Sequence, residues 1–467
     1  MKSLRQGDSD TFGLIITRRK GSEILTSSDG AGAQITYIEI PPKNRVAEQL
    51  TSAVLSKMGL RAYCLLVYSC STSALDQEAA KYALLECSAH DAGAPSGYGW
   101  HPFDRNVPLD ASSPEDNFAI AEALRRVNVS IDGETPGPFG RPGWLSELLD
   151  WAEAQIHPLG LRTTGSFRQL NASSAFSLIR IETSGPAMWF KATGEPNRHE
   201  LSVTRSLARL FPEFVPAIRA VHSAWNGWLS EEAVGTSLGD LSEFSAWECA
   251  ARDLAELQIR SIGKHLELVE NKCKDLRLPK LIEQIDPFLE RMAHLMTAQE
   301  KGIPLPLSSP ELIFLGNQLK WACSLLQDFR IPETLGHLDL NPGNIFPSQG
   351  RTVFLDWAEG CVANPLITFE YLREHLTRKD PDGQQPMENL AEAYRRPWRS
   401  LFSPGDLEHA MMISPLVAVF AFAVSTKAWR SADSPVGSVP NGYLRSLTRR
   451  MYREAALLAE RNESCPA

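Results

Sequence analysis

The 467-residue chain lacks several signals that would place it in a specialised class of protein. Its opening segment, Met1–Asp10, is polar and contains no apolar signal region. Its longest strongly apolar run, Leu416–Val424, is too short to span a bilayer and predicts a buried helix. The net charge of −9 gives no excess of basic residues. We therefore expect a cytoplasmic protein with neither a membrane nor a nucleic-acid partner.

Cysteine is present but lacks the paired spacing of a zinc site. The 8 cysteines are scattered along the chain, so we expect reduced thiols that lie mostly in the core. What the chain does have is an ordinary globular composition, with 43% hydrophobic and 22% charged residues. This composition and length predict several folded domains and exclude a disordered or fibrous protein. The oligomeric state is left open.

A proline- and glycine-rich stretch at Asp132–Gly143 divides the chain. Residues 1–143 before it are predicted to form a small α/β domain, and residues 144–160 after it a linker helix, whose apolar residues recur at helical spacing over Trp144–Ile156. The elements predicted within the first domain are strands at Phe12–Thr17, Gln34–Ile40, Ala62–Tyr68 and Tyr82–Cys87 and a helix at Arg45–Met58.

Beyond residue 160 the pattern changes from strands to helices. We predict a strand-rich N-lobe at residues 161–235 and a helical C-lobe at residues 236–467, which gives an α+β fold with two lobes. The elements expected in the N-lobe are strands at Gly165–Leu170, Phe176–Glu182, Ala187–Ala192, Pro216–Val221 and Gly227–Glu232 and a helix at Arg198–Leu210.

The most informative segment reads LGHLDLNPGNIFPSQGRTVFLDW and begins at Leu335. It places His337, Asp339 and Asn344 in the order H-x-D-x-x-x-x-N, and an apolar hairpin then leads to Asp356. This is the spacing of a kinase catalytic loop followed by its metal-binding aspartate. Asp339 would accept the proton of an acceptor hydroxyl, while Asn344 and Asp356 would offer oxygen ligands to the Mg²⁺ of ATP. His337 is expected to hold the loop. The alternative is an ordinary surface turn.

Further residues upstream fit the same reaction. Lys191 ends a predicted strand and Glu200 follows in the next helix, an arrangement that holds ATP phosphates in kinase-like folds. The polar turn that includes Ser173 and Ser174 would offer backbone amides and hydroxyls to phosphate, although it has no glycine. Each of these residues alone has an ordinary structural alternative, such as a solvated strand end or helix face.

A polar connector follows the last predicted N-lobe strand. Its main chain, between Glu231 and Val234 and with Glu232 included, is the candidate contact for the adenine edge of ATP. The alternative is an ordinary strand-to-helix loop.

Taken together, residues 165–375 resemble the aminoglycoside phosphotransferase and choline kinase family. The resemblance rests on two motifs. The segment HLDLNPGNIF is similar to that family's H-G-D-x-x-x-x-N motif, and the segment FLDW is similar to its h-D-W motif. A tryptophan after the metal aspartate and the lack of a long activation segment distinguish this family from protein kinases. The resemblance implies a bilobal kinase-like fold and ATP- and Mg²⁺-dependent phosphorylation of a small-molecule hydroxyl. It assigns the base to Asp339, metal ligands to Asn344 and Asp356, and phosphate contacts to Lys191.

The chain also departs from this family's pattern. Leu338 stands where the family has glycine before the base, and Gln258 stands where its helix motif has histidine. The segment Asn364–Thr368 lacks the acidic residue that usually follows the metal aspartate. These departures leave the chemical residues in place but set the chain apart from a typical aminoglycoside kinase.

The N-terminal segment resembles a Nudix fold more weakly. Its predicted helix ends in S-K-M-G-L, and alignment on Gly59 places the family's acidic positions on residues without carboxylates. Those positions are Ser52, Ala53, Ser56 and Lys57. The resemblance therefore implies a degenerate domain without pyrophosphohydrolase activity. The alternative is an unrelated small α/β domain.

Three acidic residues, Glu359, Glu370 and Glu374, follow the metal aspartate closely and could bind a cationic substrate. For each residue taken alone, the sequence favours the alternative of an ordinary structural side chain, such as a solvated helix face at Glu374. The resemblance to the phosphotransferase family implies that the acceptor is a small-molecule hydroxyl on an aminoglycoside or other antibiotic, an amino alcohol or a sugar-like metabolite. The competing hypothesis is a kinase-like binding or regulatory protein that has lost turnover. Because all of the expected chemical residues are retained, the sequence favours the enzyme.

Overall fold

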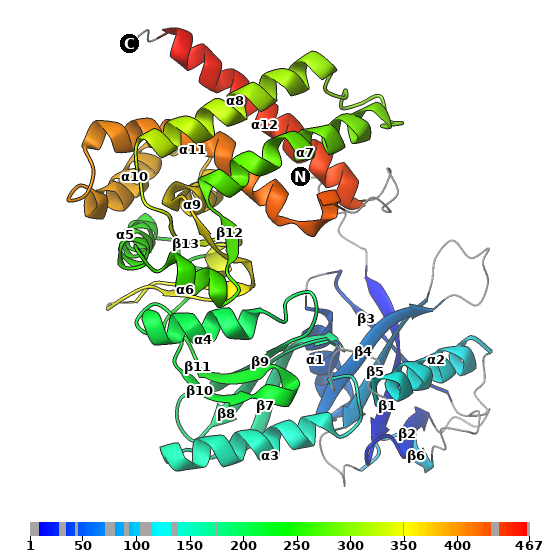
Figure 1. Ribbon diagram of the computed structural model, residues 1–467. Coiled ribbons are helices and arrows are strands. Elements are labelled where there is room, and N and C mark those ends of the chain that lie inside the picture. The colour runs from blue at the N-terminus through cyan, green and yellow to red at the C-terminus, as the bar shows by residue number, and fades with distance from the viewer. Residues whose placement is uncertain are drawn as a thin grey trace. The chain divides into compact units, whose positions relative to one another are not determined.

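The structure is a computed structural model that describes residues 9–27, 34–42, 45–70, 80–87, 93–102, 114–131, 139–173, 175–348, 350–430 and 439–464. By its internal contacts the chain forms two compact units (Figure 1). The first, rich in strands, comprises residues 1–201 and 217–232. The second, mostly helical, comprises residues 202–216 and 233–467.

The first unit opens with a six-stranded sheet in the order β4-β5-β1-β2-β6, in which β3 also pairs with β1. The pair β1–β5 is parallel and the other pairs are antiparallel. The bounds are β1 Asp10–Arg18, β2 Glu23–Ser27, β3 Thr36–Ile40, β4 Ala62–Cys70, β5 Ala80–Cys87 and β6 Tyr98–Pro102, with helices α1 Val46–Met58 and α2 Pro114–Ile131. Of these, β2, β6 and α2 were not predicted from the sequence.

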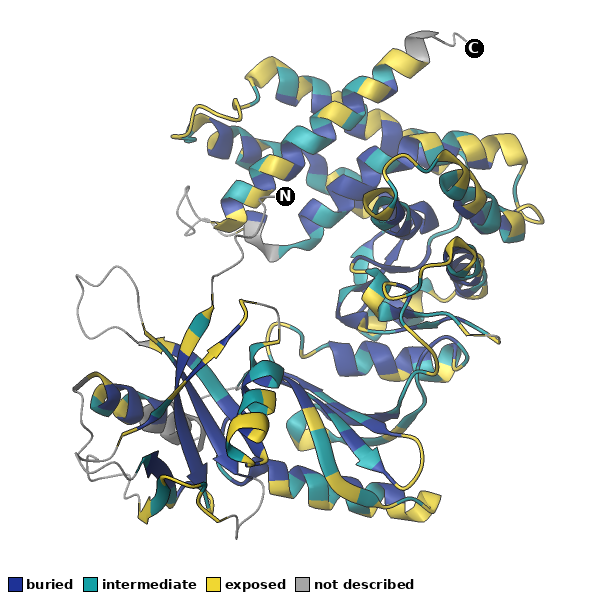
Figure 2. Cartoon of the chain, turned by 180° about the vertical axis from the view of Figure 1, so that it is seen from behind, coloured by how far each residue is buried: buried dark blue, intermediate teal, exposed yellow. Residues whose placement is uncertain are grey.

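Both faces of the central strands of this sheet, β1 and β5, are buried, and Figure 2 shows much of the sheet in the colour of buried residues. Successive residues of β1 point to opposite faces. Leu14 and Ile16 join the apolar cluster of α1, while Ile15 between them joins a second cluster that contains Ala119 of α2. This double burial explains the nearly continuous apolar sequence of β1.

The same unit contains a second, antiparallel sheet in the order β10-β11-β9-β8-β7, which corresponds to the predicted N-lobe. Its strands are β7 Thr163–Ser173, β8 Phe176–Thr183, β9 Met188–Thr193, β10 Ile218–His222 and β11 Gly227–Glu231. Helix α4, Glu200–Leu210, begins at the end of this unit, and most of its residues belong to the second unit. The predicted linker helix is α3, Trp144–Ile156, which Figure 1 shows beneath these strands.

Helix α3 joins the two sheets instead of merely connecting them. Trp144 is fully buried, with its ring 5.5 Å from that of Tyr63 on β4 and 6.0 Å from that of Phe190 on β9, centroid to centroid. Apolar residues of both sheets and of α3 therefore belong to one continuous core cluster. The N-terminal domain and the N-lobe thus share a core within one compact unit.

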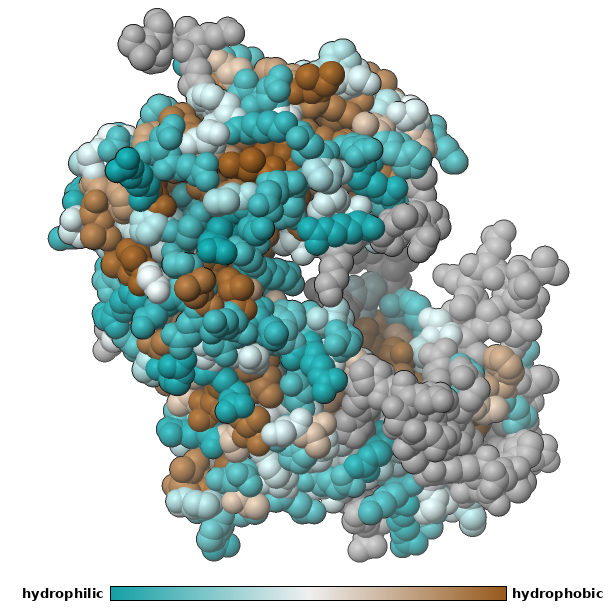
Figure 3. Space-filling model, viewed as in Figure 1, coloured by the Kyte–Doolittle hydropathy of each residue, from teal (hydrophilic) through white to brown (hydrophobic). Residues whose placement is uncertain are grey.

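The second unit holds most of the helices of the chain. They are α5 Phe244–Arg260, α6 His265–Glu270, α7 Leu278–Thr297, α8 Ser309–Asp328, α9 Pro365–Lys379, α10 Gln384–Trp398, α11 Pro404–Ser425 and α12 Val439–Ser464. A small sheet in the order β12-β16-β13 comprises β12 Lys274–Leu276, β13 Thr334–His337 and β16 Gly360–Ala363, and a hairpin pairs β14 Ile345–Phe346 with β15 Val353–Phe354. On the face shown in Figure 3, hydrophobic residues appear as separate spots among hydrophilic ones over this unit.

Helix α11 is long and apolar enough, by length and composition, to cross a membrane. However, 67% of its most apolar window is buried inside the protein, where it packs among the other helices. The predicted buried helix at Leu416–Val424 is therefore confirmed. The cysteine prediction is also supported: Cys64, Cys273 and Cys323 are free and buried, and burial raises the pKa of each thiol to about 12.

Candidate active site

The catalytic-loop motif begins at the end of β13 and is anchored by His337. This side chain is 1% exposed, its Nδ1 accepts a hydrogen bond from the backbone N–H of Asp339 (3.0 Å), and its Nε2 lies 3.0 Å from the carbonyl oxygen of Leu355. Because Nδ1 is an acceptor, Nε2 carries the proton and donates to Leu355. Burial lowers the pKa of His337, which favours this neutral form. The buried ring of Trp357 packs against it.

Asp339 follows on the exposed side of the loop, so its carboxylate can reach solvent. Asn341, which sequence reasoning did not single out, lies beside it: its Nδ2 is 3.5 Å from Oδ1 of Asp339, at the limit of a hydrogen bond. The Oδ1 of Asn341 accepts from the N–H of Gly343 at 3.0 Å, which fixes the amide's orientation. An Asn-Pro turn that caps its own backbone is the sequence signal that could have identified this residue.

The hairpin after the loop brings the two predicted metal ligands to adjacent positions. Ile345 pairs with Phe354, and one step outward the N–H of Leu355 donates to the carbonyl oxygen of Asn344 at 2.8 Å. Asp356 is therefore the next residue on the opposite arm. Its backbone φ of 64° lies in the left-handed region, which is uncommon outside glycine and occurs at functional sites.

These two residues fit a Mg²⁺ site of the kind that also uses phosphate oxygens. Asp356 is exposed and offers a carboxylate, and Asn344 offers an amide oxygen while its Nδ2 donates to the carbonyl of Asp339 at 3.2 Å. Mg²⁺ commonly takes only one or two protein oxygens and completes its shell with water and substrate phosphate. Within the described ranges, no cluster of three or more His, Cys, Asp or Glu suggests a different metal.

In the first unit, the structure pairs Lys191 with Glu200 as the sequence suggested. Nζ of Lys191 lies 2.5 Å from Oε1 of Glu200, and the side chains are only 14% and 2% exposed. The ammonium also lies 5.8 Å from the ring centroids of Phe176 and Trp228. Burial strengthens the attraction between the two charges, so the pair restricts the position of the Lys191 ammonium group.

The predicted phosphate turn is only partly described, because Ser174 lies outside the described residues. Strand β7 continues further than predicted, to Ser173, and β8 begins at Phe176. The hydroxyl of Ser173 accepts a hydrogen bond from the N–H of Ala175 at 3.3 Å, so it stabilises its own turn.

In the connector after β11, part of the main chain already forms a hydrogen bond within the protein. The N–H of Glu232 donates to the carbonyl of Ala187 at 3.3 Å, so a main-chain contact with adenine at this residue would use its carbonyl. The Glu232 carboxylate forms a two-point ion pair with Arg180 (2.6 and 2.9 Å), which holds its pKa below the usual range. Val234 is 77% exposed.

Asp339 lines a cavity of about 780 Å³ that lies wholly within the helical unit. Aromatic residues form part of the wall of this cavity, among them Tyr371, Phe422 and Tyr443. The predicted acidic residues Glu359, Glu370 and Glu374 also line this cavity. The sequence thus identified one side of the pocket, but not the contribution of Arg450 and Tyr443 from α12.

Each predicted carboxylate is paired with a cation of the protein. Glu359 forms an ion pair with Lys274, and Glu370 with Arg373. Glu374 pairs with Arg450 at 2.7 Å and with Arg378, and these cations outweigh burial and lower its pKa. Glu370 differs, because burial raises its pKa; Ser414 donates to its other oxygen at 2.8 Å.

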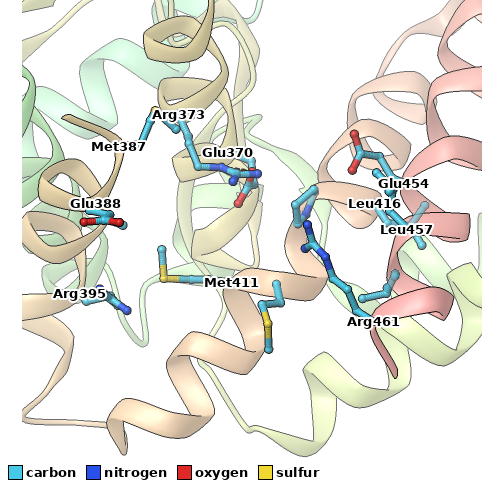
Figure 4. Close-up of a pocket in the computed structure, with 14 residues that line it drawn as sticks. Glu370, Arg373, Met387, Glu388, Arg395, Met411, Leu416, Glu454, Leu457 and Arg461 are labelled. Atoms are coloured by element: carbon cyan, nitrogen blue, oxygen red, sulfur yellow. Dashed lines mark hydrogen bonds and ion pairs between the residues drawn. The ribbon is translucent and has the colours of Figure 1, made fainter. Parts of the chain in front are cut away.

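A second cavity of about 360 Å³ adjoins the first, and Figure 4 shows its lining. The two cavities share four lining residues: Glu370, Arg373, Pro415 and Glu454. The paired Glu370 and Arg373 therefore form part of a partition between them. Among the described residues, Glu454 forms no ion pair, so Asp339 and Glu454 are the carboxylates of the larger cavity that lack a cationic partner.

No protein-family model and no curated protein matches the chain. Among solved structures, it is similar to the macrolide 2'-phosphotransferase of Brachybacterium faecium (14% identity, 64% of this chain and 97% of that chain, TM-score 0.45). It is also similar to choline kinase of Cryptosporidium parvum (11% identity, 64% and 90%, TM-score 0.45). A third is spectinomycin phosphotransferase, solved with ADP and spectinomycin (10% identity, 66% and 98%, TM-score 0.41). The function proposed below rests on this chain's own motif and geometry.

Proposed function

We propose that the protein is an ATP- and Mg²⁺-dependent phosphotransferase that phosphorylates a hydroxyl group of a small molecule. The observation that carries this proposal is the loop from His337 to Asp356. It presents an exposed carboxylate, Asp339, to a sizeable cavity and sets Asn344 and Asp356 side by side on one hairpin.

In the proposed reaction, ATP supplies the transferred phosphoryl group and Mg²⁺ neutralises its charge. Asp339 accepts the proton of the acceptor hydroxyl as that oxygen bonds to the γ-phosphorus and the bond to the leaving ADP oxygen breaks. Asn344 and Asp356 would hold the metal, and Lys191, oriented by Glu200, would hold the α- and β-phosphates. His337 positions the loop through the backbone and does not touch the substrate.

The charge of the cavity narrows the choice of acceptor. A polycationic substrate would need several uncompensated carboxylates, but Glu359, Glu370 and Glu374 already have cationic partners. A carboxylate whose charge is already balanced by a nearby cation attracts a second cation less strongly than an unpaired carboxylate does. Asp339 and Glu454, which have no cationic partner within the described ranges, and the aromatic residues of the cavity together favour a weakly charged acceptor. Within the predicted set, we therefore favour amino alcohols and glycosides with at most one amine over aminoglycosides.

A screen of ADP release tests the proposal. Purified protein with Mg-ATP is offered amino alcohols, macrolides, sugars and aminoglycosides, and the Asp339→Asn variant is run beside it. We expect at least one weakly charged compound to stimulate ADP release in the unaltered protein only. Tight Mg-ATP binding with no stimulation by any class would instead favour the alternative, a kinase-like binding or regulatory protein.

A further inference from the structure

Strand β7, which leads into the proposed phosphate turn, is contacted at several points by the N-terminal domain. Nη1 of Arg61 donates to the hydroxyl of Ser166 at 2.8 Å. Nε of Arg168 lies 3.4 Å from Oε1 of Glu48 on α1. Near the end of the strand, Ala172 packs against the apolar cluster formed by α1 and its sheet. The contacts run from the start of β7 almost to the turn.

The central contact of this series is made by Gln169. Its side chain is 1% exposed; its Oε1 accepts from the N–H of Cys64 and its Nε2 donates to the carbonyl of the same residue, both at 2.8 Å. The amide thus pairs with β4, an edge strand of the N-terminal sheet, as a neighbouring strand would. Both strands are irregular here, with register shifts at Cys64/Leu66 in β4 and Gln169/Asn171 in β7.

The same side chain makes a longer contact further along β7, in the direction of the turn. Nε2 of Gln169 lies 3.4 Å from the carbonyl oxygen of Asn171, the residue that follows the bulge. The turn has no glycine to let a phosphate come close to its backbone, so we expect its fit to a phosphate to depend on how the strands β7 and β8 on either side of it are held. The groups that bind a phosphate must be placed accurately, and supporting contacts such as these keep them in place. When the contacts are lost, the phosphate-binding groups are displaced.

We propose that Gln169 is a positioning residue through which the N-terminal domain sets the phosphate grip of the nucleotide site. This inference rests on the proposed function, and it gives the N-terminal domain a role that needs no chemistry of its own. Its specific consequence is that Gln169 acts on the phosphates of the nucleotide and not on its base.

The test compares Mg-ATP with adenosine by calorimetry on the full chain. Gln169→Leu removes both hydrogen bonds, which corresponds to roughly a 5- to 30-fold loss of Mg-ATP affinity if they serve the phosphate turn. Adenosine affinity should stay within about twofold, because the base does not touch this turn. A purely structural role would weaken both ligands together or neither.

A matched control is available in the helical unit. Gln258 is equally buried and equally bonded: its Nε2 donates to the carbonyl of Pro365 at 2.9 Å, and its Oε1 accepts from the hydroxyl of Tyr394 at 2.6 Å. Gln258→Leu should lower the melting temperature to a similar extent and leave the ratio of Mg-ATP to adenosine affinity unchanged. A changed ratio in this control would overturn the assignment to Gln169.

A milder variant covers the case in which Gln169→Leu does not fold. Glu48→Ala removes the ion pair with Arg168 on the same contact and should weaken Mg-ATP selectively but less. If the variants bind Mg-ATP as the unaltered protein does, the inference is wrong while the proposed function stands. If the unaltered protein itself does not bind Mg-ATP, the proposed function fails and the inference fails with it.

Discussion

The Nε2 atom of His337 lies 3.0 Å from the carbonyl oxygen of Leu355, the residue that precedes Asp356. The other ring nitrogen accepts from the N–H of Asp339. One neutral imidazole therefore joins the backbone of the proposed base to the backbone of the proposed metal ligand. Because the ring is buried and both of its nitrogens are used, its role in the proposed reaction would be carried only through these two residues.

This relationship predicts the effect of His337→Gln. A glutamine amide cannot span both backbone partners in the same geometry, so Asp339 and Asp356 should lose their relative alignment. Displacement of reacting groups by about 1 Å can cost on the order of 100-fold in rate. We expect kcat for ADP release to fall by about that factor while KM for the acceptor changes little. His409→Gln, at a half-buried histidine outside the cavity, is the control, and equal losses in both variants would contradict the assignment.

Asp339→Asn tests the base directly. The substitution keeps the shape of an exposed side chain, so the melting temperature and the Mg-ATP affinity should stay nearly unchanged. Loss of a general base typically lowers the rate by roughly 10²–10⁴-fold. Slow hydrolysis of ATP by water can report this loss before an acceptor is known. Asp328→Asn, at an exposed position on α8, is the matched control; full activity of Asp339→Asn would remove this residue from the base role.

Asp356→Asn should behave differently, because it weakens a metal ligand and not the base. We expect Mg-ATP to bind at least about tenfold more weakly, in addition to a loss of rate. Without Mg²⁺, in the presence of chelator, the variant and the unaltered protein should bind ATP equally weakly. Calorimetry in both conditions checks this, and a variant that keeps full Mg²⁺ dependence would show that the metal lies elsewhere.

The local part of this site could be predicted from the sequence, because its residues lie on one hairpin. The spacing from Asn344 to Asp356 leaves room for a turn and two short strands, and β14 and β15 pair as that spacing requires. The Lys191–Glu200 pair was also within reach, since only nine positions separate a strand end from the next helix.

The charge state of the cavity was beyond sequence reasoning, because it depends on contacts that are distant in the chain. Glu359 finds its partner Lys274 at a separation of 85 positions, and Glu374 finds Arg450 at 76. The acidic residues alone suggested a site for cations, whereas the partners neutralise them. The shared core of the N-terminal domain and the N-lobe was not predicted for the same reason. In the sequence, Trp144 is only one apolar residue of an amphipathic helix, and its contacts with residues of both sheets are evident only in the structure.

A final prediction concerns pH and a residue outside the proposed active site. Glu333 lines a cavity of about 440 Å³, where its Oε1 accepts from the N–H of Leu278 at 2.9 Å. Its Oε2 is buried and has no hydrogen-bond partner among the described residues. Burial raises the pKa of Glu333 from 4.5 to about 7, although nearby Arg277 opposes the change. The folded protein therefore prefers this carboxyl protonated.

The sign of the effect on stability follows from that preference. A folded-state pKa above the unfolded value gives a contribution that is complete below about pH 4.5 and is lost as the pH rises through about 7. At 1.36 kcal/mol per pKa unit, the contribution amounts to at most about 3 kcal/mol. This group should therefore lower the melting temperature of the unaltered protein as the pH is raised from 5 to 8.

Glu333→Gln removes the titrating group and keeps an oxygen for the Leu278 amide, so its melting temperature should depend less on pH over this range. Other titrating groups are common to both proteins, so the difference between the two slopes isolates Glu333. At roughly 2–4 °C per kcal/mol, the slopes should diverge by several degrees, which scanning calorimetry resolves. Glu300→Gln, at an exposed carboxylate, should leave the slope unchanged. Parallel slopes for Glu333→Gln and the unaltered protein would mean that the carboxylate of Glu333 is ionised in the folded state at pH 5, contrary to the effect of its burial.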